Sequence, residues 1–169
     1  MSFWVEIGLF LLPIYVANAS AMVFGGGTPM DLGGRAWDGR PWLGKGKTFK
    51  GTFFGVFFGA MTALVLAAMF PVQTAAMVPN FVLFGFVISC GALMGDIVES
   101  FLKRRLGFSS GHEWVIADQM DFIVGALVFG WMLFLPTLAQ IIAIVVISLV
   151  MHRLANLIAF KTKLKTVPW

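Results

Sequence analysis

Charged residues are scarce in this chain: of its 169 residues 12% are charged and 59% are hydrophobic, and the mean hydropathy is +0.91. Soluble domains carry about 25% charged residues. The shortage excludes an ordinary soluble protein and predicts an integral membrane protein. A chain of this length has room for one compact unit, so we expect a single integral membrane domain over residues 1–169.

Cysteine is almost absent as well. The one cysteine, Cys90, lies within an apolar run, so neither a disulfide framework nor a thiolate metal cluster is available. We expect Cys90 to be a small packed residue. The N-terminus lacks a basic segment and a small-residue cleavage site, so the first apolar run predicts a retained membrane span rather than a signal peptide.

Five apolar runs are long enough to cross a bilayer, whose core of about 30 Å requires roughly 20 helical residues. The third and fourth runs reach this length only if their helices continue through acidic residues. The sequence therefore predicts an all-α, polytopic membrane helix bundle with five transmembrane helices. The five predicted spans are Phe3–Phe24, Thr52–Phe70, Phe81–Leu102, Trp114–Leu135 and Thr137–Ile158.

The basic residues predict the orientation of these spans. They fall into three groups: Arg35, Arg40, Lys45, Lys47 and Lys50; Lys103, Arg104 and Arg105; and Arg153, Lys161, Lys163 and Lys165. The turns at 71–80 and 135–137 contain none. By the positive-inside rule the N-terminus lies outside, and the C-terminus and the loops 25–51 and 103–113 are cytoplasmic. We expect a multi-pass protein of the cell membrane, with the pI near 9.6 explained without nucleic acid.

Two pairs of carboxylates, Asp96 with Glu99 and Asp118 with Asp121, lie inside the third and fourth predicted spans. Each pair has the spacing i, i+3, which places it on one face of a helix. Ionisable groups in spans are costly and point to function. The short connecting loop predicts antiparallel helices with the four acids facing one cavity. Oxygen ligands of this kind suit Mg²⁺ or Mn²⁺; structural ion pairs with the bases at 103–105 are the alternative.

The segment Gly25–Gly51 is rich in glycine and lysine. Glycines let backbone amides approach an anion closely, and Lys45 and Lys47 add positive charge, a combination that suits a polyphosphate. The spacing around Thr48 does not fit a P-loop. Binding of the lysines to lipid headgroups is the alternative. Asp38 can join the metal site or form an Asp-Gly turn, and the sequence leaves both open.

Two motifs in the chain resemble a known family. The run Gly95-Asp96-x-x-Glu99-Ser100-x-x-Lys103-Arg104, followed by Asp118-x-x-Asp121, resembles the C-terminal signature of the CTP-dependent phosphatidate cytidylyltransferases. Lys47-Thr48-Phe49-Lys50-Gly51 is similar to their Lys-Thr-aromatic-x-Gly stretch. The small size and the glycine-rich loop look most like the archaeal branch of this family, the CDP-archaeol synthases.

The resemblance implies a membrane transferase of phospholipid biosynthesis. It transfers CMP from CTP to an ether-lipid phosphate, unsaturated archaetidic acid, and releases CDP-archaeol and pyrophosphate with Mg²⁺ (or Mn²⁺) as cofactor. Diacyl phosphatidate is the alternative lipid. The implied catalytic and metal-binding residues are Asp96, Glu99, Asp118 and Asp121. The implied substrate-binding residues are Asp38, Lys45, Lys47, Thr48, Ser100, Lys103 and Arg104.

Three departures from the bacterial and eukaryotic pattern favour the archaeal branch. Glu113-Trp114-Val115 stands where those enzymes have His-Gly-Gly, Gln119 replaces an arginine between the two aspartates, and Lys50 replaces an acid. A small cation-coupled transporter is the main hypothesis from another class, since such proteins also carry acids within spans. A CDP-alcohol phosphotransferase is disfavoured because Asp121 is not followed by its Gly-x-x-Ala-Arg sequence. No oligomeric state is predicted.

Overall fold

The computed structural model describes residues 2–109, 112, 114, 117–161 and 163. Of the residues discussed above, Glu113, Val115 and Lys165 lie outside this part of the chain. The predicted all-α class is confirmed, with six helices in the described residues: α1 (Phe3–Val23), α2 (Phe49–Met69), α3 (Pro71–Met77), α4 (Phe81–Arg105), α5 (Ala117–Gly130) and α6 (Leu138–Lys161).

Three of these helices, α1, α2 and α4, are long and apolar enough to cross a membrane. Helix α6 has 24 residues, and its part Leu138–Leu154 is an apolar stretch of 17 residues. Helix α5 has 14 residues, about 21 Å at 1.5 Å per residue, which is less than a bilayer core. The membrane character of the chain is thus confirmed, while five spans and their orientation remain predictions.

Two elements differ from the sequence prediction. The predicted turn 71–80 contains the short helix α3, because Pro71 occupies its first turn with a backbone angle already suited to a helix. The fourth predicted span is shorter than expected and ends at Gly130, after which the chain turns through residues 131–133. At this end the helix packs tightly on α4, since a side chain at Gly130 would meet Ile88 at 2.8 Å.

Local hydrogen bonds explain where the other helices begin and end. The side chains of Thr48 and Asn80 each accept a backbone N–H three residues ahead, at 3.1 and 3.0 Å, and cap α2 and α4. Thr137 and Gln140 form a reciprocal capping box before α6. Gly107, with φ of +90°, turns the chain after α4.

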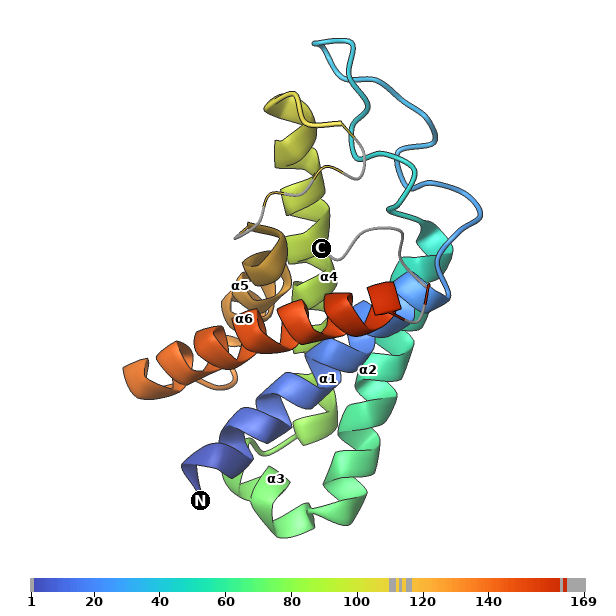
Figure 1. Ribbon diagram of the computed structural model, residues 1–169. Coiled ribbons are helices and arrows are strands. Elements are labelled where there is room, and N and C mark those ends of the chain that lie inside the picture. The colour runs from blue at the N-terminus through green and yellow to red at the C-terminus, as the bar shows by residue number, and fades with distance from the viewer. Residues whose placement is uncertain (1, 110–111, 113, 115–116, 162, 164–169) are drawn as a thin grey trace.

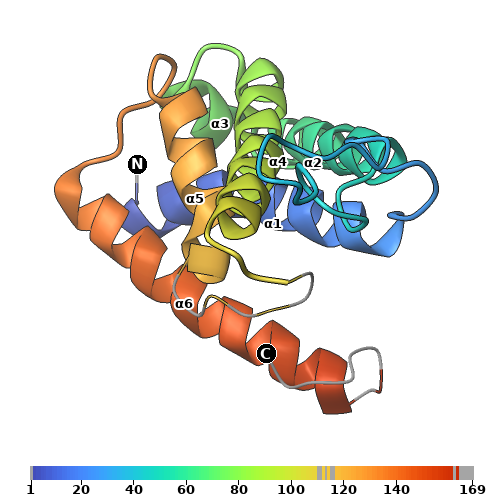
Figure 2. The ribbon, with the colours of Figure 1, turned by 90° about the horizontal axis from the view of Figure 1, so that it is seen from above.

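The glycine-rich segment between α1 and α2 lies at the same end of the molecule as the C-terminal end of α4 (Figure 1). Helix α3 lies at the opposite end. Seen from above, α4 and α5 run through the middle, and α6 crosses one side of the bundle (Figure 2). The segments that carry the predicted lysine loop and the predicted acid pairs therefore meet at one end of the bundle.

Small residues set the distances between the central helices. Gly55 and Gly59 of α2 are buried against α1 and α4, where a methyl group would collide with Leu93 and Ser89. Gly95 of α4 and Gly125 of α5 bring these two backbones into direct contact. Such small residues are typical of helix packing in membranes, because lipid offers no hydrophobic drive for association and close van der Waals contact replaces it.

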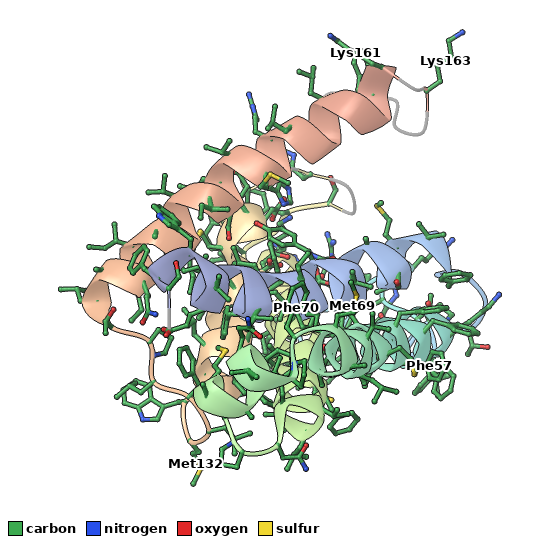
Figure 3. The ribbon with its side chains drawn as sticks, turned by 90° about the horizontal axis from the view of Figure 1, so that it is seen from below. Phe57, Met69, Phe70, Met132, Lys161 and Lys163 are labelled. Atoms are coloured by element: carbon green, nitrogen blue, oxygen red, sulfur yellow. The ribbon has the colours of Figure 1, made fainter. Side chains whose placement is uncertain are left out.

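The outer surface of the bundle is apolar. Phe53 and Phe57 on α2, and Val98 and Leu102 on α4, are between 45% and 65% exposed. Figure 3 shows Phe57 on the outer side of the bundle and Lys161 beyond the far end of α6. An apolar exterior around a core of Phe, Ile and Ala is what contact with lipid requires.

Replacement of Gly125 by alanine is expected to destabilise the bundle. The new methyl group would lie 2.8 Å from the backbone nitrogen of Gly95 and closer still to the carbonyl oxygen of Gly91. Overpacking of this kind costs about 1–3 kcal/mol, which corresponds to a fall in Tm of roughly 2–10 °C in detergent. Gly8→Ala is the control, because nothing lies within 4 Å of its added methyl group. Equal Tm values for the two variants would contradict the proposed tight contact between α4 and α5.

Candidate active site

The contact between α4 and α5 brings acidic side chains from both helices together. Carboxylate oxygens of Asp96, Glu99 and Asp121 lie within 4.8 Å of one another. Gly95 is the reason for this proximity, since a methyl group there would collide with the backbone carbonyl of Asp121. The i, i+3 spacing on α4 and the antiparallel partner helix thus gather three of the four predicted acids in one cluster.

The fourth acid, Asp118, joins this cluster through a lysine. Lys103 is buried on α4 and lies one helical turn after Glu99, with its Nζ 3.0 Å from Glu99 Oε1. The same Nζ forms an ion pair with Asp118 on α5. A single ammonium group is thus shared by two largely buried carboxylates, and this part of the structure matches the ion-pair alternative raised by the sequence.

The glycine-rich loop contributes a second lysine to the acids. Lys47, just before α2, forms an ion pair with Asp96 of α4. Its backbone is held by the hydrogen bond from Met30 N to Lys47 O at 2.8 Å. The next residue, Thr48, is buried and caps α2. Lys47 therefore brings one cation to the carboxylates, and Thr48 begins helix α2, which packs against α4.

Asp31 holds the loop in shape. Its carboxylate accepts backbone N–H groups of Gly33 at 3.1 Å, Leu43 at 3.1 Å and Gly44 at 2.9 Å. Burial acts to raise the pKa of Asp31, but these backbone donors outweigh it and hold the pKa below its usual value. The carboxylate therefore stays ionised at neutral pH and closes the loop between residues 31 and 44.

A cavity of about 550 Å³ lies between the loop and the end of α4. Its described lining includes three cationic side chains, those of Arg40, Lys45 and Arg104, and no carboxylate. The remaining lining residues are Pro41, Gly44, Gly107, Phe108 and Ser109. The size is within the range of pockets for small ligands, and the charge favours an anion. Arg104 lines the cavity, whereas Lys103, the residue before it on α4, contacts the carboxylates.

The structure distributes the sequence-predicted residues over three places. Lys47 and Lys103 contact the carboxylates, and Lys45 and Arg104 line the basic cavity. Ser100 is buried on α4 beside Glu99 in the sequence. Asp38 adopts the Asp-turn that the sequence left open, accepting the backbone N–H of Arg40 at 3.0 Å, and its Oδ1 lies 2.5 Å from Arg105 NH1.

Sequence reasoning assigned no role to Arg40, Phe108 and Ser109, which line the cavity. Five bases in a glycine-rich loop indicate anion binding, but the sequence carries no signal for which of them point inward. Ser109 comes near the loop only because Gly107 turns the chain back after α4.

The carboxylate cluster fits a divalent cation. Oxygen ligands of Mg²⁺ are about 4.2 Å apart on opposite sides of the ion and about 3 Å apart on adjacent sides, so oxygens within 4.8 Å of one another could close around one ion by side-chain movements. Glu99 Oε1 lies 3.0 Å from Lys103 Nζ, and because a carboxylate oxygen has two lone pairs it can accept a further ligand. Carboxylate oxygens with unused acceptor capacity are the donors that hard cations prefer.

Comparison with known proteins identifies relatives over nearly the whole chain. The sequence model of the family described as CarS-like: CDP-archaeol synthase matches residues 3–169. The CDP-archaeol synthase of Methanocaldococcus jannaschii is 40% identical over 166 residues, covering 95% of this chain and 94% of the relative. That of Methanococcus aeolicus is 44% identical over 168 residues, with coverage of 95% and 94%. That of Pyrococcus abyssi is 39% identical over 168 residues, with coverage of 99% and 96%.

A solved structure shares the fold. It is described as an intramembrane enzyme for archaeal membrane lipids biosynthesis, and it superposes with a TM-score of 0.80 at 33% identity. The match covers 88% of this chain and 91% of the solved one. Sequence and fold therefore agree on the same group of membrane enzymes.

Replacement of Lys103 by methionine is expected to lower the stability of the metal-free protein. The substitution keeps the length of the side chain but leaves Glu99 and Asp118 without their shared cation. Loss of one partner from a buried ion pair costs about 3–5 kcal/mol. The Tm in detergent with a chelator should fall, and the added change Glu99→Gln should restore part of it. Lys161→Met is the control, since Lys161 is exposed at the end of α6; an unchanged Tm for Lys103→Met would contradict the shared ion pair.

Proposed function

The chain belongs to the CDP-archaeol synthase family, and from this premise we propose that it transfers CMP from CTP to unsaturated archaetidic acid, an ether-lipid phosphate. The products are CDP-archaeol and pyrophosphate. The family assignment makes the chain a nucleotidyltransferase of archaeal lipid synthesis. The observation that carries the proposal is a basic cavity at the same end of the bundle as a carboxylate cluster, since a nucleoside triphosphate needs cations along its phosphates and a hard cation site near them.

The basic cavity is the proposed binding place of the nucleotide. Its volume of about 550 Å³ and its three cations suit a compact polyanion. Arg40 and Arg104 donate some guanidinium N–H groups to backbone carbonyls, and their remaining N–H groups would bind phosphate oxygens, with Lys45 adding a mobile ammonium group. Ser109 adds a hydroxyl donor at the rim. Lys47, ion-paired with Asp96, lies between this loop and the carboxylates and is placed to bind the phosphates that extend toward them.

The carboxylate cluster is the proposed cation site. Asp96, Glu99 and Asp121 would hold Mg²⁺, with Mn²⁺ as a substitute. Asp118, which is paired with Lys103 in this structure, would be the fourth acidic ligand. The ion would supply charge neutralisation on the triphosphate and on the leaving pyrophosphate. Lys103 pairs with both Glu99 and Asp118 and holds their side chains in position next to this site.

The reaction needs no general base from the protein. A phosphate oxygen of the lipid is already ionised at neutral pH; it attacks the α-phosphorus of CTP, and the bond from that phosphorus to the β-phosphate oxygen breaks. The residues hold the two anions close together and neutralise their repulsion, which positioning and fixed charges can accomplish. His112 is stacked on Phe108 and His152 on Phe122, so both rings have packing roles in this arrangement.

The lipid is proposed to approach from the cytoplasmic leaflet. The loop of bases and the carboxylates lie at the same end of the bundle, and the positive-inside rule assigns that end to the cytoplasm. The apolar outer faces of α2 and α4 offer a surface for isoprenoid chains, and the lipid phosphate would then lie at the level of the bases.

An activity assay with two lipids tests the proposal. Purified protein in detergent receives labelled CTP, Mg²⁺ and either unsaturated archaetidic acid or diacyl phosphatidate. We expect labelled CDP-lipid and pyrophosphate in equal amounts from the ether lipid, with lower turnover of the diacyl lipid. A preference for diacyl phosphatidate would replace the proposed lipid, and no product from either would overturn the proposed function.

Replacement of Asp121 by asparagine tests the cation site. The variant keeps the shape of the side chain but removes one of the three clustered charges. We expect turnover to fall by about 100-fold or more and Mn²⁺ binding, followed by electron paramagnetic resonance without nucleotide, to weaken in parallel. Glu6→Gln is the control, because Glu6 bonds to Gln140, away from the cluster. Unchanged Mn²⁺ affinity in Asp121→Asn would refute this ligand assignment.

A further inference from the structure

Arg105, the last residue of α4, joins the glycine-rich loop to the helix. Its NH1 lies 2.5 Å from Oδ1 of Asp38, and its NH2 donates to the backbone carbonyls of Arg40 and Pro41. Partial burial opposes it, yet the backbone N–H of Arg40 and the charges of Arg105 and Arg40 hold the pKa of Asp38 below its usual value. Asp38 is therefore an ionised partner for Arg105 throughout the neutral range.

Aromatic rings surround the same guanidinium group. Its central carbon lies 5.4 Å from the ring centre of Trp37, 5.9 Å from that of Trp42 and 5.3 Å from that of Phe101. Trp42 in turn stacks on Phe101 of α4, with ring centres 5.9 Å apart and planes 18° apart. Arginine binds a carboxylate in plane while its faces contact rings. Lysine, a point charge, cannot reproduce both contacts.

These contacts fix one wall of the basic cavity. Pro41 and Arg40, whose carbonyls bind Arg105, both line the cavity. The side chain of Arg40 donates back to the carbonyl of Arg105 at 2.9 Å, and Arg104 donates to Leu43 O at 3.0 Å. Arg105 itself is absent from the cavity lining. It therefore holds the wall without facing the ligand.

We propose that Arg105, with Asp38 and the rings of Trp37 and Trp42, is a positioning residue that sets the shape of the nucleotide site. This inference depends on the proposed function only in naming CTP as the ligand of the cavity. It gives Asp38 a part different from the direct substrate contact predicted from the sequence: its carboxylate orients Arg105, and Arg105 orients Arg40 and the adjoining wall.

Kinetics of Arg105→Lys and Asp38→Asn test this positioning role. Both variants should raise the KM for CTP by about tenfold and leave the KM for the lipid phosphate within about twofold. The double variant should lose little more than either single variant, because both changes break the same contact. Arg35→Lys is the matched control: it changes another arginine of the loop, one that donates to Gly39 O within the loop. Equal shifts in both KM values, or additive losses, would overturn the proposal.

Hydrogen exchange without nucleotide separates this inference from the proposed function. Arg105→Lys and Asp38→Asn should both speed backbone exchange in residues 30–45 and leave α2 unchanged, whether or not the protein turns over CTP. Slow exchange in both variants would refute the attachment of the loop by Arg105. Faster exchange with an unchanged KM for CTP would show a purely structural attachment and would also overturn the proposal. An inactive wild-type protein whose variants show the faster exchange would instead place the failure in the proposed function.

Discussion

The need to neutralise buried carboxylates shapes the functional end of this protein. Glycines at the contact between α4 and α5 bring Asp96, Glu99 and Asp121 within 4.8 Å of one another. Like charges at such distances repel strongly where water is scarce. Two lysines offset this repulsion: Lys47 of the loop forms an ion pair with Asp96, and Lys103 of α4 forms one with Glu99. A divalent cation would satisfy the same demand, which is why the arrangement suits metal-assisted chemistry on phosphates.

The cations of the protein serve two separate purposes. Lys47 and Lys103 contact acids, whereas Arg40, Lys45 and Arg104 line a cavity whose described residues include no acid. Both groups lie at one end of the bundle because the loop folds onto the end of α4. A polyanion in the cavity would therefore lie at the same end of the bundle as the acids. This division between charge balance in the helices and anion binding in the loop is consistent with a reaction between two phosphates.

The sequence predicts some elements of this architecture well and others poorly. The boundaries of α1 and the start of α4 follow from the long apolar runs. The short helix α3 and the early end of α5 do not, because α3 starts at a proline in a segment expected to be a turn, and the end of α5 at Gly130 falls inside a continuous apolar run. The meeting of the acids on α4 and α5 follows from spacing and from the short loop between them. The inward direction of Arg40 and the attachment by Arg105 depend on where the loop folds, which no periodicity encodes.

By itself, the sequence determined that this chain is an all-helical membrane protein with two pairs of acids on apolar helices, since hydropathy and charge placement act locally along the chain. It also indicated the family, through the resemblance of the acid pairs and the Lys-Thr stretch, and the match of the family model over residues 3–169 confirms it. Only the tertiary structure decided which acids share a centre, which base neutralises each, and which cations line the cavity. The reason is physical: a helix fixes neighbours three or four residues apart, whereas contacts between Asp38 and Arg105 or Lys47 and Asp96 exist only once distant segments have packed.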